Sequence, residues 1–105
     1  MIVADTDLMA WLETVPDTRP VVMVPYVKSR LNATIQYQLT ATRRGVTGLA
    51  TIKQSGNLQL KASTPAQLTR FSLSVGSQDD CKIELVLFSH GNTLGTYQFA
   101  CPRLQ

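Results

Sequence analysis

The sequence predicts an all-β fold, an immunoglobulin-like antiparallel β-sandwich of about seven strands that forms one domain over residues 1–105. Three observations lead to this prediction. Apolar and polar residues alternate along several stretches, turn-forming residues separate those stretches, and 44% of the chain is apolar, which suits a packed core. The Cys…Trp…Cys spacing of antibody domains is missing, so we expect a variant of that sandwich.

The alternation locates the strands. Along residues 35–42, Ile, Tyr, Leu and Ala alternate with Gln and Thr, and the same period of two returns at 71–75 and 83–87. The stretch "DLMAWLETV" fits a short helix capped by Asp7 as well as a strand, and we favour the strand. The expected strands lie near residues 8–14, 20–28, 33–43, 48–60, 67–75, 81–89 and 94–101.

Two residues disturb otherwise regular strand patterns. Pro25 in "VVMVPYV" has no amide hydrogen to donate, so this strand is expected at a sheet edge or with a bulge. Gly56 falls within the long stretch 48–60, where we expect an interruption of the strand.

The charged residues are segregated along the chain. All seven acids lie at positions 5–17 or 79–84, whereas the segment from Thr18 to Gln78 holds eight Lys and Arg residues and no acid. This pattern is typical of a basic face that attracts an acidic partner. Eight solvated surface charges without a role would give the same pattern.

Several function classes find little support. No apolar run approaches the about 20 residues that span a bilayer, so we expect no membrane insertion. One histidine and two cysteines are too few for a metal site, and His90 in "SHGNT" is expected to be a turn residue rather than a general base. Because the chain has neither a phosphate-binding glycine loop nor aromatic residues interleaved with basic ones, we expect no cofactor, no catalysis and no nucleic acid partner.

The two cysteines lie at the ends of one predicted hairpin. Cys81 shares a strand face with Ile83, Leu85 and Leu87. Cys101 shares one with the aromatic residues at 97 and 99, so both thiols should point to the buried side. A three- or five-residue loop centred on Gly91 sets Cys81 opposite Cys101, at a non-hydrogen-bonded pair within disulfide reach. Closing this loop should contribute about 3 kcal/mol.

A structural disulfide competes with two other interpretations. A redox pair normally has CxxC-like spacing and a basic environment, whereas Asp79 and Asp80 directly precede Cys81. Two buried free thiols in a cytosolic protein are the other alternative. We favour the structural cross-link.

The stretch "YQLTATRRGVTGLATIKQSGNLQLKASTPAQLTRFSLSVGSQDDCKIELVLFS" resembles the periplasmic curli assembly proteins of the CsgC/CsgH type. The matching segments are "RRGVTGLATIKQSGNLQL", "LTRFSLSV" and "QDDCKIELVL", and upstream "VVMVPYV" fits the apolar strand with a proline in that family. The similarity covers roughly residues 20–100. Its CsgC branch carries a Cys-x-Cys motif whose matching positions here are Ala33 and Ile35, so a redox role of that motif does not transfer, and the cysteine placement looks more like the CsgH branch.

The resemblance implies a periplasmic, chaperone-like protein that keeps the major curli subunit from forming amyloid prematurely, without nucleotide and without covalent chemistry. A monomer is expected. The start, "MIVADTDLMAWLE", has acids where a signal peptide carries basic residues, so it is not expected to be an intact export signal. The protein is then either cytosolic or separated from its signal.

Two modes of client binding fit this function: electrostatic capture by the basic segment, or strand addition to an exposed sheet edge. Arg43 and Arg44 are expected in the turn of the "TATRRGVTG" hairpin with exposed side chains. The candidate client-binding residues are Arg43, Arg44, Lys53, Lys28 and Arg30. Two other function classes stay open, a periplasmic thiol–disulfide oxidoreductase and a structural sandwich subunit of a surface fibre.

Overall fold

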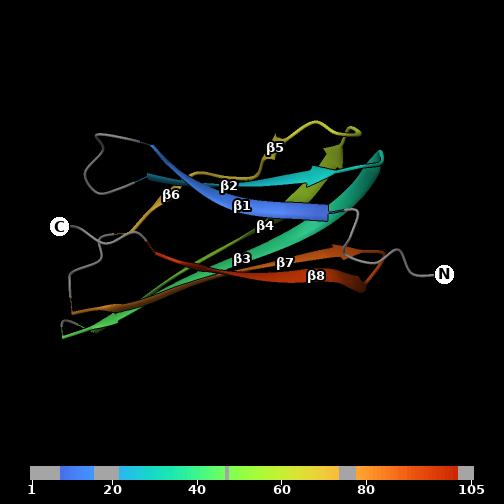
Figure 1. The fold of residues 1–105 in the computed structure, drawn as a ribbon. Helices are drawn as coiled ribbons and strands as arrows, with labels where there is room; N and C mark the ends of the chain where they lie inside the picture. The colour runs from blue at the N-terminus through green and yellow to red at the C-terminus, as the bar shows by residue number, and fades with distance from the viewer. Residues whose placement is uncertain (1–7, 16–21, 47, 74–77, 102–105) are drawn as a thin grey trace.

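The computed structural model describes residues 8–15, 22–46, 48–73 and 78–101, and every regular element in these ranges is a strand (Figure 1). The strands are β1 (Leu8–Val15), β2 (Val22–Ser29), β3 (Ala33–Gly45), β4 (Gly48–Leu60), β5 (Ala66–Gln67), β6 (Phe71–Ser72), β7 (Asp80–Ser89) and β8 (Asn92–Ala100). The stretch "DLMAWLETV" is therefore a strand along its described part, as expected, and not a helix.

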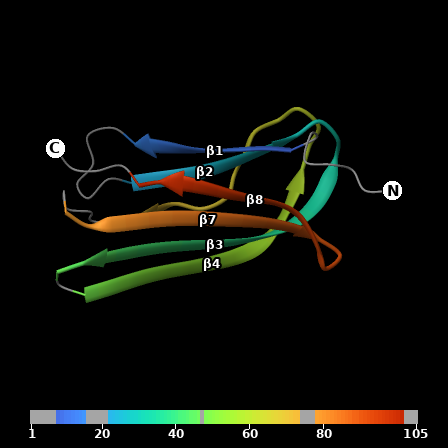
Figure 2. The same ribbon diagram turned by 60° about the horizontal axis from the view of Figure 1, so that its bottom comes forward.

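The strands form two sheets with antiparallel pairing throughout. The smaller sheet has the order β1-β2-β5, with β6 also paired to β2, and the larger sheet has the order β4-β3-β7-β8 (Figure 2). The predicted all-β sandwich is confirmed, with eight strands in place of about seven.

The expected strand at 67–75 is replaced by the two short strands β5 and β6, and its last two residues lie outside the described ranges. Pro25 provides the physical reason. Its carbonyl oxygen accepts a hydrogen bond from the Leu68 amide at 3.0 Å, but the proline ring leaves no N–H to return the bond. Pairing with β2 therefore stops after Ala66–Gln67 and resumes at Phe71. The predicted edge position of this strand is wrong, because β2 lies between β1 and the β5/β6 pair.

The predicted interruption at Gly56 is also wrong. β4 runs unbroken beside β3 through 13 paired positions. Gly56 lies opposite Tyr37, and a Cβ atom added at Gly56 would meet the end of the Tyr37 ring at 3.0 Å. The glycine thus makes room for an aromatic ring across the strands, and the pairing of β4 with β3 continues through it.

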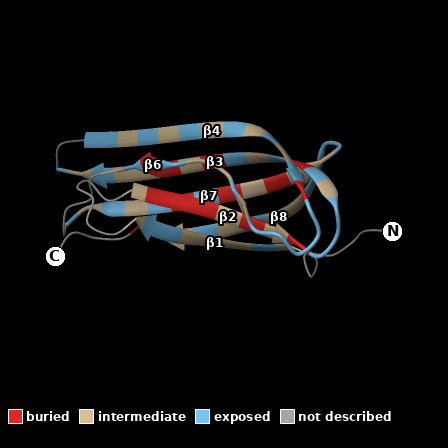
Figure 3. Ribbon diagram, turned by 90° about the horizontal axis from the view of Figure 1, so that it is seen from above, coloured by how far each residue is buried: buried red, intermediate tan, exposed pale blue. Residues whose placement is uncertain are grey.

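The hydrophobic core lies between the sheets and follows the predicted alternation. The strands that contribute most of the fully buried side chains are β2, β3 and β7 (Figure 3). The core cluster consists of Met23, Val27, Ile35, Leu39, Ala41, Leu60, Phe71, Ile83, Leu85, Leu87 and Cys101. Because successive strand residues face opposite sides, the residues between them form the outer surface of each sheet.

The β7–β8 hairpin has the predicted register along most of its length, but its loop is not the predicted one of three or five residues. Ser89 pairs with Asn92, so the loop has two residues, His90 and Gly91, with φ angles of 52° and 80°. Two positive φ angles are typical of a type I′ turn, which matches the twist of a hairpin. A β-bulge at Leu94 then shifts the register, so that farther along the hairpin Ile83 faces Phe99 as predicted.

Candidate functional site

The disulfide between Cys81 and Cys101 is present in the structure, with a Cα–Cα distance of 5.7 Å. Cys101 is buried and Cys81 is half-buried against the core. The predicted pairing is correct, but its position in the ladder differs. The Cα separation matches the about 5.5 Å of a hydrogen-bonded pair better than the about 4.5 Å of a non-hydrogen-bonded pair. The bond ties the start of β7 to the residue after β8 and has the placement of a structural cross-link.

Arg43 and Arg44 do not lie in the hairpin turn. Both belong to β3, and successive residues of a strand point to opposite faces. Arg44 is exposed on the outer face of the larger sheet, whereas Arg43 is half-buried on the side of Ala41, near Cys81. Only Arg44 therefore has the exposed position that the sequence suggested for the pair.

The structure does not bring the five candidate cations onto one face. Lys53 is exposed on β4 and shares the outer face of the larger sheet with Arg44. Lys28 and Arg30 belong to β2 of the other sheet and to the connection that follows it. Lys28 is half-buried and pairs in register with Met9 of β1.

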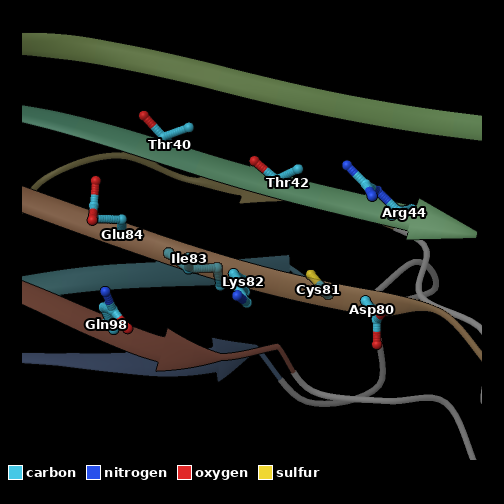
Figure 4. A pocket seen from close by; sticks show the side chains of 9 residues that line it. All are labelled: Thr40, Thr42, Arg44, Asp80, Cys81, Lys82, Ile83, Glu84 and Gln98. Atoms are coloured by element: carbon cyan, nitrogen blue, oxygen red, sulfur yellow. The ribbon is translucent and has the colours of Figure 1, made fainter.

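The outer face of the larger sheet carries acids as well as cations. β7 is hydrogen-bonded to β3, and this pairing sets Asp80 beside Arg44 and Glu84 beside Thr40. A pocket is lined by side chains from these strands and from β8 (Figure 4). It is lined by Thr40, Thr42, Arg44, Asp80, Cys81, Lys82, Ile83, Glu84 and Gln98. The acid-free segment of the sequence is thus not an acid-free surface, because the strand with the acids pairs directly with it.

Uncharged polar side chains make up most of this outer face. Cross-strand rows join β4 to β3, for example Asn57 with Gln36 and Ser55 with Gln38. The exposed uncharged polar members on β3, β4 and β8 are Thr34, Gln36, Gln38, Thr51, Ser55, Asn57, Gln59, Thr93, Thr96 and Gln98. The sequence showed that the chain is rich in Thr and Gln, but only the pairing of strands shows that these residues form one continuous surface.

The smaller sheet carries an aromatic pair that the sequence analysis missed. Trp11 and Tyr26 face each other across β1 and β2, with ring centroids 5.6 Å apart and an angle of 7° between the planes. The Trp11 indole Nε1 donates a hydrogen bond of 2.9 Å to a Glu13 carboxylate oxygen. The alternation of residues could have indicated that both rings lie on the outer face, since Trp11 and Tyr26 both alternate with the apolar residues that face the core.

The described residues form no cluster of metal ligands. Within residues 8–15, 22–46, 48–73 and 78–101, no three His, Cys, Asp or Glu side chains gather where they could hold a metal ion. His90 lies in the β7–β8 turn. Those same ranges contain no helix that is long and apolar enough to cross a membrane. The absence of catalysis, cofactor and metal stays a prediction.

Comparisons with known proteins identify relatives over most of the chain. The family model described as thin aggregative fimbriae synthesis protein matches residues 2–99. The curli assembly protein CsgC of Salmonella typhimurium is 32% identical over 83 residues, which cover 79% of this chain and 76% of that protein. The protein of the same name from Salmonella arizonae is 32% identical over 72 residues, covering 69% and 66% of the two chains.

Two solved structures share the fold. The curli protein CsgC of E. coli has a TM-score of 0.75 at 24% identity and covers 88% of this chain and 97% of its own. The solution structure of CsgH from R. palustris has a TM-score of 0.69 at 16% identity, with 89% and 91% covered. By both measures this chain is more similar to that CsgC than to that CsgH, although its cysteine placement suggested the CsgH branch. The family match and the identity to curated relatives together show that the chain belongs to the CsgC family of curli assembly proteins.

Proposed function

We propose that this protein is a periplasmic, chaperone-like inhibitor that keeps the major curli subunit from forming amyloid fibres prematurely. The observation that carries the proposal is membership in a family of curli assembly proteins. The disulfide supports the compartment, because such bonds persist in the oxidising periplasm and are rare in the cytosol. The protein acts as a monomer, by non-covalent binding and without a cofactor.

The outer face of the larger sheet supports this function. Amyloid strands associate through backbone pairing and through stacked amide side chains. The outer face offers exposed Gln, Asn, Ser and Thr side chains in cross-strand rows, so it can hydrogen-bond the side chains of a client without offering a large apolar patch. A client held there is kept from pairing with a second client.

Charge contributes to client capture through the cations of the same face. Arg44 and Lys53 are exposed on it, and they are the members of the candidate set Arg43, Arg44, Lys53, Lys28 and Arg30 that share a surface. Acidic side chains of a client would be attracted to them, and Asp80 and Glu84 on the neighbouring strand would limit where an acid can approach.

A fibrillation assay tests the proposal. A freshly diluted curli subunit is followed with an amyloid dye, with this protein at about one part in ten or less and, as the matched control, with an unrelated β-sandwich of similar size and net charge. The expected result is a longer lag only with this protein. An equal lag in both reactions contradicts the proposed inhibition.

A further inference from the structure

The larger sheet has two edge strands, and they are protected to different degrees. β8 contains the bulge at Leu94, lies in contact with β1 and borders a hollow that it shares with β1. Among the residues that the structure describes, β4 has neither a bulge nor a covering strand. Its register with β3 is continuous over 13 positions, it contains no proline, and Lys53 is its one charged residue. Long, regular edges with few charges are the ones that accept another strand.

The direction of the backbone groups of β4 follows from the β7–β8 turn. A two-residue type I′ loop is closed by a hydrogen-bonded pair, here Ser89 and Asn92, so odd-numbered residues of β7 bond to β8 and even-numbered ones bond to β3. The β3–β7 register then directs odd-numbered residues of β3 to β4, and the β3–β4 register pairs them with even-numbered residues. The odd-numbered residues of β4 consequently direct both N–H and C=O away from the sheet.

Six consecutive odd-numbered residues present these groups along the edge: Leu49, Thr51, Lys53, Ser55, Asn57 and Gln59. All six are exposed, and in the described part of the chain no further strand pairs with them. The connection at 68–70 contacts β4 through the side chains of Thr69 and Gln54, and Gln54 belongs to the even-numbered residues that face away from the exposed row. These six residues thus form a row of unpaired backbone donors and acceptors along the edge, and an extended partner strand can pair with them.

The side chains beside the edge indicate which partner fits. An added strand would place one set of side chains next to Ser55, Asn57 and Gln59, continuing rows of amides and hydroxyls. Lys53 lies near the middle of the edge, so a second copy of β4 in antiparallel pairing would bring two lysines together at the centre. An acid on the incoming strand would instead be attracted to Lys53.

We infer that the free edge of β4 binds the curli subunit by strand addition, pairing with an extended segment that is rich in Gln, Asn, Ser and Thr and carries an acid near Lys53. This inference rests on the proposed inhibition and places the client at the β4 border of the outer face, where backbone pairing adds to the side-chain contacts proposed above. A bound segment has one of its two edges paired with β4. The next amyloid strand cannot add at that edge, because the strand that carries Lys53 occupies the place.

One pair of variants tests the edge directly. Ser55 and Thr96 lie at opposite ends of one cross-sheet row that passes through Gln38 and Val86, and both are exposed. Ser55→Pro removes an outward N–H from the β4 edge, and Thr96→Pro makes the matched change at the β8 edge, where proline is tolerated for the same reason. Ser55→Ala controls for loss of the hydroxyl.

In the fibrillation assay, Ser55→Pro is expected to raise the amount of protein needed for a given lag by about tenfold or more, because the bonds around residue 55 and the approach of the strand are lost. Thr96→Pro and Ser55→Ala should match the wild type. A wild-type-like Ser55→Pro, or a loss confined to Thr96→Pro, overturns the assignment to β4. A wild type without any effect on the lag contradicts the proposed function itself.

Amide hydrogen exchange keeps the inference testable if a proline variant fails to fold. Adding soluble curli subunit to the wild type should slow exchange at the amides of residues 51, 53, 55, 57 and 59, with little change at the even-numbered positions between them. If exchange slows equally at the odd- and even-numbered amides of β4, strand addition is overturned. Protection that rises with the concentration of the protein alone, together with a doubled mass in light scattering, assigns the edge to a second copy and overturns the proposed partner.

Discussion

The two hairpins of the larger sheet are made of similarly alternating strands, yet their free sides differ. The β7–β8 hairpin has a type I′ turn, a bulge at Leu94 and a disulfide at its open end. The β3–β4 hairpin has 13 continuous pairs and neither of those last two devices. Stability and accessibility are therefore separated within one sheet: the cross-link holds one edge in place, while in the described part of the chain the other edge keeps its backbone N–H and C=O groups unpaired.

The largest expected effect concerns the cross-linked hairpin. Cys81→Ala/Cys101→Ala should destabilise the protein by about 3 kcal/mol, because the unfolded chain loses the constraint of a loop that spans 20 residues in sequence. Thermal unfolding should show a melting temperature lower by roughly 10 °C or more. Inhibition measured well below that temperature should persist, since the bond lies away from the β4 edge. An unchanged melting temperature, or inhibition lost from a folded variant, would contradict this division.

A smaller effect is expected from one glycine in each hairpin. Gly91→Ala should cost about 1–2 kcal/mol, because Gly91 has a φ angle of 80° that residues with a Cβ atom rarely adopt. Gly56→Ala should cost less than about 1 kcal/mol, because the new methyl group meets only the end of the Tyr37 ring, which can move aside. Chemical denaturation of both variants checks the order. The reverse order would mean that Tyr37 is held more rigidly than its half-buried position indicates.

The smallest effect on stability is expected from the charges on the outer face. Arg44→Glu/Lys53→Glu should change stability by less than about 0.5 kcal/mol, since both side chains are exposed. This variant should delay fibrillation less than the wild type does. The control is Lys28→Glu/Arg30→Glu, in β2 and the connection after it, which should delay fibrillation as much as the wild type. Raising the salt concentration to about 0.15 M, where charges are screened over about 8 Å, should weaken the wild type as well. A lag unaffected by both changes would remove charge capture and leave strand addition alone.

Local patterns predicted the elements of this fold well. The strands at 33–43, 48–60 and 81–89 agree with β3, β4 and β7 within two residues, since alternation over eight or more residues has a single interpretation. The disulfide was also predictable, because parity and register decide which residues face each other.

The features that were not predictable depend on which strands become neighbours. Nothing local shows that β7 pairs with β3 and brings Asp80 beside Arg44, so a basic segment of sequence was taken for a basic surface. The division of the fifth expected strand depends on Pro25, about 45 residues away in sequence, because the missing N–H affects the neighbour of its strand. The direction of the N–H and C=O groups at the β4 edge likewise depends on the β7–β8 turn, which lies beyond β3 in the sheet.

The bulge at Leu94 has a consequence for how the chain folds. A hairpin slipped by one residue would carry Cys101 to the opposite face of β8, and a slip of two would separate the Cα atoms beyond the about 7 Å that a disulfide can bridge. Oxidation therefore traps chains whose last strand is correctly aligned, while misaligned chains retain free thiols that can still exchange. The disulfide can thus form in one alignment of the last hairpin, and the extra residue in β8 defines that alignment.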